Sequence, residues 1–178
     1  IISIFFLYQF PARGSNEKVV SSLVFCYVCI PMSAFRRILS RIRRRSLLKF
    51  IYSDSYWMID IGRHVFPAKK YRMIYEKMLA MGIRKEQFIS PFSAEDEDIL
   101  LVHSPRYLRK LKTHKLSHAE MLALELPFSK EILSFFRLTV GGTIVAARTA
   151  LEEGMAFHIG GGFHHSLADH GEDFCVFN

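Results

Sequence analysis

The stretch Ala156-Phe157-His158-Ile159-Gly160-Gly161-Gly162-Phe163-His164-His165 decides the fold. Residues 156–159 have the short, apolar pattern of a buried strand. Glycines let the backbone pass close to its neighbours or take a positive φ, and two adjacent imidazoles can transfer protons near neutral pH. The pattern therefore predicts a strand whose carboxyl end carries a loop with candidate chemistry.

Regular elements precede this strand. They are a strand at 50–52, an amphipathic helix at 71–79, three short helices with caps at Ser93, Ser104 and Ser117, and a long helix at 133–153. Gly141 and Gly142 lie inside the long helix, where each glycine costs about 1 kcal/mol against Ala, so they predict close packing against another element. The order predicts an α/β fold with a central parallel sheet flanked by helices. Ligands in such sheets bind beyond the carboxyl ends of the strands, where His164 and His165 fall.

The net charge of +7 comes from one segment. Residues 36–49 hold seven basic residues and no acid, and the rest of the chain has 17 basic and 17 acidic residues. A nucleic-acid-binding domain spreads basic charge over a surface, so we expect no specific nucleic-acid partner. An isolated arginine run is typical of a tail or a membrane-proximal cluster.

Residues 1–47 differ from the remainder, and we expect a boundary between this N-terminal extension and a domain at 48–178. The extension has apolar runs at 1–10 and 19–32, followed by the arginines. The second run is shorter than the ~20 residues that span a bilayer, and a signal peptide has its basic residues before the apolar run. Membrane anchor, signal-like segment and upstream sequence before a true start at Met32 remain the alternatives, and we favour the last.

The cysteines do not indicate a disulfide, metal or catalytic role. The chain has three cysteines, which give no disulfide framework. Cys26 and Cys29 have the spacing of a redox or metal pair, but they lie in an apolar run without a second pair. We expect them to be buried thiols, and Cys175 to be structural rather than a nucleophile.

Four motifs in order across residues 48–178 resemble the histone deacetylase family of zinc amidohydrolases. The segment GGGFHHS at 160–166 with DFCVFN at 173–178 resembles the tandem-histidine motif of that family. Residues 49–54 with 62–67 resemble its first strand and helix entry, 102–108 its Val-His-x-x-x-Tyr-Leu segment, and 138–143 the small-residue helix before the histidines. The sequences of these motifs are most similar to those of the bacterial and class IV-like branch of the family.

The resemblance implies hydrolysis of N-acetyl or other N-acyl groups from lysine or a small acetylated amine. Zinc would polarise the carbonyl and activate water, so the full-length protein is expected to bind zinc. The family's metal ligands, an Asp-x-His pair and a further Asp, lie downstream of the Phe-Cys segment, where this chain has ended. The chain is thus expected to be an N-terminal fragment that is inactive alone, from a cytoplasmic enzyme.

The resemblance also assigns residue roles. His165 would be the principal general base and acid, and His164 its electrostatic and hydrogen-bonding partner. Phe174 matches the aromatic wall of the tunnel that holds the lysine stem, with Gly162 and Phe163 also at the substrate. Arg72 matches the family's internal-cavity arginine, and the alternative for it is a solvated helix face.

One departure lies beside the site. The family usually has Gly before the tunnel Phe, and this chain has Asp173. A side chain there would crowd the channel or place a carboxylate near the histidines.

A metal site within this chain is not expected. His158, His164, His165 and His170 cluster in sequence, but His158 lies in the predicted strand and adjacent histidines in extended backbone point to opposite sides. We therefore assign no metal ligand. The other four histidines (His64, His103, His114 and His118) are expected to serve packing, capping or the surface.

Two functions from different classes remain open. The first is the deacetylase fragment. The second is an inactive membrane-associated or interaction module that uses the basic segment 36–49.

Overall fold

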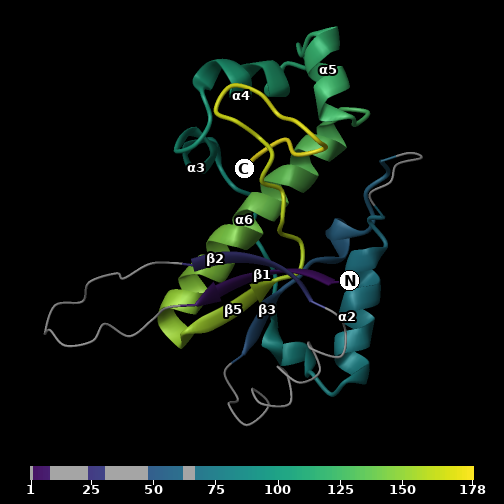
Figure 1. Ribbon diagram of the computed structural model, residues 1–178, viewed down its shortest axis with the longest axis vertical. Helices are drawn as coiled ribbons and strands as arrows, with labels where there is room; N and C mark the ends of the chain where they lie inside the picture. Colours follow the sequence, from purple (N-terminus) through teal and green to yellow (C-terminus); the bar gives the residue numbers. More distant parts are fainter. Residues whose placement is uncertain (1, 9–23, 31–47, 62–66) are drawn as a thin grey trace, which may run out of the picture.

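A mixed five-stranded sheet forms one layer of the molecule (Figure 1). The computed structural model describes residues 2–8, 24–30, 48–61 and 67–178, the first two ranges as backbone. The strand order is β2-β1-β5-β3-β4, in which β3 (Lys49–Ile51), β4 (Phe88–Ile89) and β5 (Met155–His158) are parallel. The α/β class and both predicted strands are confirmed.

The other two strands come from the amino-terminal segment. β1 (Ile2–Tyr8) pairs antiparallel with β2 (Val24–Ile30) and, on its other side, with β5. Sequence analysis predicted a central parallel sheet and no strands in these apolar runs. The segment assigned as an extension therefore contributes two strands to the same sheet. The arginines at 36–45 and the side chains of Cys26 and Cys29 lie outside what the structure describes.

The long helix α6 (Lys130–Glu153) connects two groups of elements (Figure 1). Its carboxyl half packs against β5 and β3, and its amino half reaches the helices that surround the end of the chain. The remaining helices are α2 (Lys70–Ala80), α3 (Asp96–Leu100), α4 (Pro105–Lys112) and α5 (His118–Leu124), with 3₁₀ turns η1 (Asp54–Tyr56) and η2 (Lys85–Gln87). Among the described ranges, no helix has both the length and the apolarity to cross a bilayer.

Two of the three predicted helix caps are confirmed. The hydroxyl of Ser104 accepts from the Tyr107 amide at the start of α4, and Ser117 forms a reciprocal capping box with Glu120 in α5. The predicted cap at Ser93 is wrong, because α3 begins at Asp96 and Glu95 is its cap. Glu95 forms a capping box with Asp98, whose carboxylate accepts from the Glu95 backbone amide at 3.1 Å.

The glycines of α6 let the helix approach its neighbours, as predicted. A methyl group on Gly141 would collide with the backbone carbonyl of Phe92, and one on Gly142 with His158 and Tyr56. Both glycines are buried in the core. This close approach fixes α6 on the sheet and sets where the loop after β5 begins.

Candidate active-site loop

The loop after β5 carries the candidate site. Ile159 continues the sheet pairing by donating its amide to the Ile51 carbonyl. Gly160 follows against the ring of Tyr56, where a Cβ would collide, and Gly162 has φ +112. A side chain at Gly162 would be strained in that conformation. The glycines thus turn the chain out of the sheet toward the histidines.

The two histidines of the loop lie side by side and are exposed. The ring centroids of His164 and His165 are 4.4 Å apart, with an interplanar angle of 34°. The expectation that the two side chains point to opposite sides is therefore wrong, because the chain here turns and is not an extended strand. His164 Nδ1 is 2.9 Å from the Gly162 carbonyl. A carbonyl only accepts hydrogen bonds, so Nδ1 of His164 carries the proton.

A carboxylate faces the second imidazole. Oδ2 of Asp173 lies 3.2 Å from Nδ1 of His165. This is the residue that departs from the family pattern. Of the two consequences predicted for it, the structure shows the carboxylate next to the histidine pair.

The phenylalanines of the site form an apolar wall. Phe163 packs edge-to-face on Phe136, with centroids 4.7 Å apart, and is half-buried. Phe174 is also half-buried and shares a small apolar cavity with Phe163 and Phe136. The two aromatic residues singled out from the sequence are therefore brought together, on the inner side of the histidine loop.

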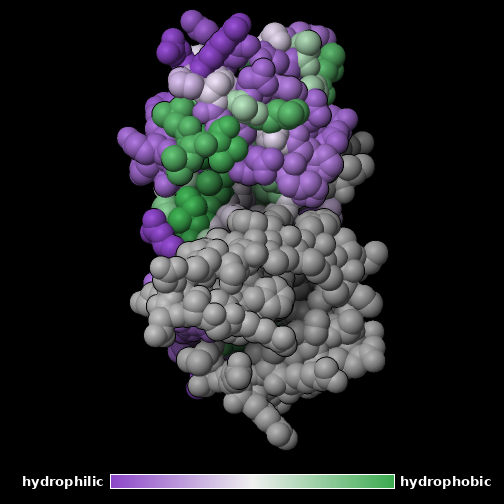
Figure 2. Space-filling model, turned by 60° about the vertical axis from the view of Figure 1, so that its left-hand side comes forward, coloured by the Kyte–Doolittle hydropathy of each residue, from purple (hydrophilic) through white to green (hydrophobic). Residues whose placement is uncertain are grey.

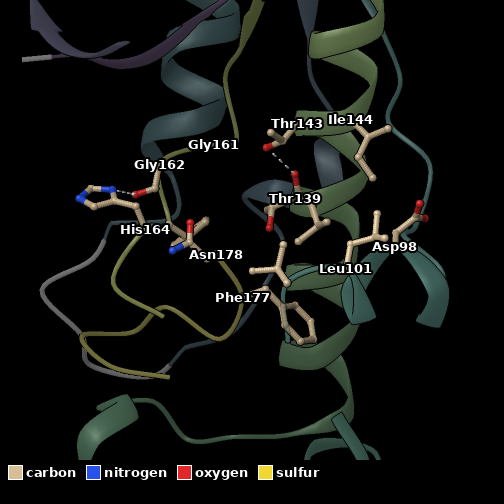
Figure 3. A pocket seen from close by; sticks show the side chains of 13 residues that line it. Asp98, Leu101, Thr139, Thr143, Ile144, Gly161, Gly162, His164, Phe177 and Asn178 are labelled. Carbon is tan, nitrogen blue, oxygen red and sulfur yellow. Dashed lines mark hydrogen bonds between the residues drawn. The ribbon is translucent and has the colours of Figure 1, made fainter. Parts of the chain in front are cut away.

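A larger cavity of about 540 Å³ opens between α3, α6 and the carboxyl-terminal segment. Figure 3 shows Thr139 and Thr143 on one wall, Leu101 and Phe177 on another, and His164 at the far edge with its ring turned toward the Gly162 carbonyl. Leu101 is 85% exposed at this cavity. Apolar side chains also gather on the face that Figure 2 brings forward.

Two residues of the Val-His-x-x-x-Tyr-Leu motif hold the end of the chain. The hydroxyl of Tyr107 donates to the Val176 carbonyl at 2.9 Å. The backbone amide of Asn178 donates to His103 Nε2 at 3.1 Å. His103 is buried, one of the three environments left open for it. Burial lowers its pKa, and hydrogen bonds with the backbone of Leu167 and Ala168 act in the opposite direction. The motif therefore positions the segment that follows the histidines.

His158 belongs to a buried polar cluster that sequence analysis missed. Its Nε2 is 2.8 Å from the Tyr56 hydroxyl and its Nδ1 is 3.2 Å from the Thr143 hydroxyl. Complete burial lowers the pKa of His158 to about 3. Tyr56 is buried, and its pKa is raised for the same reason. A histidine at the end of a buried strand was the available signal, because it requires polar partners.

The described residues do not fit a metal ion. Within them, no three His, Cys, Asp or Glu side chains come together as possible ligands. His170 is 2.7 Å from Asp169 through Nδ1 and 3.2 Å from Glu172 through Nε2, so both its nitrogens face carboxylates. The hydrogen bond to Asp169 raises the pKa of His170. The titratable side chains described in this loop are imidazoles and carboxylates.

Two further residues singled out from the sequence, Arg72 and Cys175, lie away from the histidine pair or are buried. Arg72 is half-exposed on α2, pairs with Glu76 at 2.7 Å and lies over the Trp57 ring. It is not among the residues that line the 540 Å³ cavity, and the internal-cavity role stays a prediction. Cys175 is buried, and burial raises the pKa of its thiol, which favours the unreactive form.

His114 and His118 lie apart from the histidine pair. His118 is the exposed first residue of α5, and His114 lies against Phe128. His64 lies outside the described residues.

Comparisons with known proteins agree with this architecture. The family profile described as "Histone deacetylase domain" matches residues 64–178. Histone deacetylase 2 of Arabidopsis thaliana is 32% identical over 186 residues, which cover 99% of this chain and 44% of that protein. An uncharacterised protein of Picosynechococcus is 34% identical over 72% of this chain and 43% of its own length. The chain thus spans less than half the length of these relatives.

A solved structure shares the fold. The crystal structure of an HDAC homologue from Aquifex aeolicus matches 74% of this chain and 38% of its own, with a TM-score of 0.60 and 21% sequence identity. The chain therefore covers only part of that fold.

Proposed function

The chain belongs to the histone deacetylase family, and on that premise we propose that the whole protein hydrolyses N-acetyl or other N-acyl groups from lysine or a small acetylated amine. Residues 48–178 would form the N-terminal part of its catalytic domain. The acyl carbonyl is attacked by water, the C–N bond breaks, and the products are a carboxylic acid and a free amine.

The adjacent imidazoles carry this proposal. With the Nδ1 proton of His164 bound to the Gly162 carbonyl, the neutral ring keeps its lone pair on Nε2. His165 lies beside it with Nδ1 toward a carboxylate. Two exposed rings oriented through Nδ1 supply the proton acceptor and donor that amide hydrolysis requires.

We assign the two proton transfers to His165. Its Nε2 would accept a proton from water as the oxygen attacks, and would return a proton to the departing nitrogen. His164 would support the charge that develops on its neighbour. The same order of roles follows from the resemblance described above.

The substrate would lie against the aromatic wall. Phe174 would flank the stem of the acylated lysine, which suits an apolar surface because acylation removes its charge. Phe163 supports that wall, and Gly162 leaves the space next to His164 without a side chain.

Zinc is the cofactor expected for the family, but the described residues provide no ligand set for it. The 178-residue chain by itself is therefore expected to show no turnover. The alternative function, through the basic segment 36–49, depends mostly on residues outside those that the structure describes. No observation favours it.

The test uses this chain completed at its carboxyl end with the remaining region of the Arabidopsis relative. In it, His165→Ala should lower deacylation of an acetyl-lysine peptide by roughly 100-fold or more, the usual contribution of a general base or acid. His170→Ala is the matched control, because His170 is a partly exposed imidazole of the same loop that pairs with Asp169, and it should retain turnover. Near-normal turnover of His165→Ala would contradict the proposal.

A further inference from the structure

A second cavity, of about 260 Å³, lies between α4, the first turn of α5 and the loop that follows the histidine pair. It shares no lining residue with the apolar 540 Å³ cavity. Every residue that lines it has a polar side chain: Ser104, Arg106, Tyr107, Lys110, Glu120, Asp169 and His170. What such a cavity can bind depends on which of these polar groups already have partners.

The carboxylates of this cavity are already paired. Glu120 accepts from the Lys110 ammonium at 2.6 Å and, through its other oxygen, from the Ser117 amide at 2.7 Å. The hydrogen bond from Lys110 lowers the pKa of Glu120 to about 2, so its carboxyl group is ionised. Oδ1 of Asp169 lies 2.7 Å from Nδ1 of His170. The negative charges of the lining are therefore matched within the protein.

The guanidinium of Arg106 is not matched in this way. Arg106 is exposed on α4, and among the described residues it takes part in no hydrogen bond or ion pair. Its charge acts only at a distance, because the pKa of Asp169 is lowered by the hydrogen bond with His170 and, more weakly, by Arg106. A guanidinium has only donors, so it leaves several N–H groups for a ligand in the cavity.

Two further donors of the lining are available. Lys110 gives one hydrogen of its ammonium group to Glu120 and has others left. The Ser104 hydroxyl accepts from the Tyr107 amide at 3.2 Å, and no described residue accepts the proton of that hydroxyl. The cavity thus has a surplus of donors, while its carboxylates are engaged. A ligand that offers several acceptor oxygens satisfies this surplus.

The charge around α4 also favours an anion. The segment 99–119 has five basic residues and no acid, namely Arg106, Arg109, Lys110, Lys112 and Lys115. Acids from outside the segment pair with two of them, Glu120 with Lys110 and Asp96 with Lys112. The remaining positive charge attracts anions toward this side of α4.

We propose that this cavity binds the phosphate group of a small soluble phosphate monoester, with Arg106 and Lys110 as the charged donors and the Ser104 hydroxyl as a neutral one. A guanidinium binds two phosphate oxygens side by side. Pockets for drug-sized ligands have volumes of roughly 300–1,000 Å³, so this smaller cavity suits a phosphate with a short carbon chain. The proposed deacylation assigns no role to these donors, so the two proposals are tested separately.

The experiment titrates the ¹⁵N-labelled 178-residue chain with inorganic phosphate and with glycerol 3-phosphate. Saturable changes in chemical shift are expected at the amides of α4 and of residues 169–170. Arg106→Ala should weaken binding roughly tenfold or more, the usual effect of losing a hydrogen bond between charged groups. Its melting temperature should stay the same, because the Arg106 side chain has no hydrogen bond or ion pair among the described residues.

Arg109→Ala is the matched control, because Arg109 is an exposed arginine of the same helix that does not line the cavity. Its affinity for both phosphates should be unchanged. Asp169→Asn removes the carboxylate closest in charge effect to Arg106 and should bind glycerol 3-phosphate at least as tightly as the unchanged chain.

Three results would overturn the proposal: no saturable shift with either phosphate, equal weakening in the two arginine variants, or equally tight binding of acetate. Binding to vesicles that contain phosphatidic acid, without binding of glycerol 3-phosphate, would overturn the assignment to a small soluble ligand.

Discussion

Single residues show how tightly the sheet and α6 are joined. Gly142 approaches His158 and Tyr56 so closely that an added methyl group has no space. We expect Gly142→Ala to lower the free energy of unfolding by about 1–3 kcal/mol, the usual cost of overpacking, despite the better helix propensity of alanine. Urea denaturation measures this.

Ser134→Ala is the control in the same helix. Ser134 is exposed and donates its hydroxyl to the Lys130 carbonyl one turn earlier. Its replacement should change the free energy of unfolding by no more than about 0.5 kcal/mol. Equal effects of the two substitutions would show that α6 does not press on the buried cluster.

The buried imidazole of His158 should make the folding stability depend on pH. Burial lowers its pKa from 6.5 to about 3 in the folded state, so between those values the unfolded chain binds one more proton. Stability must then fall as pH falls, by about 2 kcal/mol between about pH 7 and about pH 5. Burial of His103 acts in the same direction. Unfolding in urea at the two pH values measures the slope.

The slope should become smaller in His158→Gln, because glutamine does not titrate. His118→Gln is the matched control, since His118 is exposed on α5 and its loss should leave the slope unchanged. An unaltered slope in His158→Gln would mean that His158 is protonated as readily in the folded as in the unfolded chain.

At the scale of elements, α4 fastens the carboxyl-terminal segment. Tyr107→Phe removes the donor to the Val176 carbonyl, which still accepts from the Ser166 hydroxyl at 3.0 Å. The expected loss is about 1 kcal/mol of unfolding free energy, with faster amide exchange at 175–178. Thr113→Val is the control. It removes an exposed hydroxyl bond to Arg109 at the end of the same helix, and faster exchange at 175–178 in that variant alone would contradict this account.

Local signals predicted these elements well where the chemistry is local. The hydroxyls of Ser104 and Ser117 act within one helical turn, and the glycines of α6 reported close packing correctly. The cap at Ser93 failed because Glu95 can fulfil the same role two residues later. Adjacent serine and acidic residues leave that choice open in a sequence.

Long-range geometry was beyond the same reasoning. Nothing local to Asp173 shows that α5 accepts its amide and that its carboxylate turns to His165. The close approach of the His164 and His165 rings depends on a turn of the backbone that an extended-strand pattern does not contain. The motif resemblance predicted where the candidate site lies in the sequence, and the fold shows how its side chains are oriented.

At the scale of the whole molecule, an apolar face stands open. Leu101 and Val102 are 85% and 54% exposed at the edge of the 540 Å³ cavity. Exposed apolar patches of this kind bind apolar probes. We expect the chain to enhance the fluorescence of the dye ANS and Leu101→Lys to reduce that enhancement. Leu151→Lys, at an exposed position of α6 that does not line the cavity, should not. Equal dye binding by the two variants would count against this face.

The sheet order has a consequence for any shortened version of this protein. β5 has β3 on one side and β1 on the other. A polypeptide that starts at Met32 would carry the histidine loop but neither β1 nor β2. β5 would then be an edge strand, with unpaired backbone amide and carbonyl groups on the side where β1 lies. Exposed edge strands pair with strands of other molecules. The shorter chain would therefore be prone to aggregate unless another segment covers that edge.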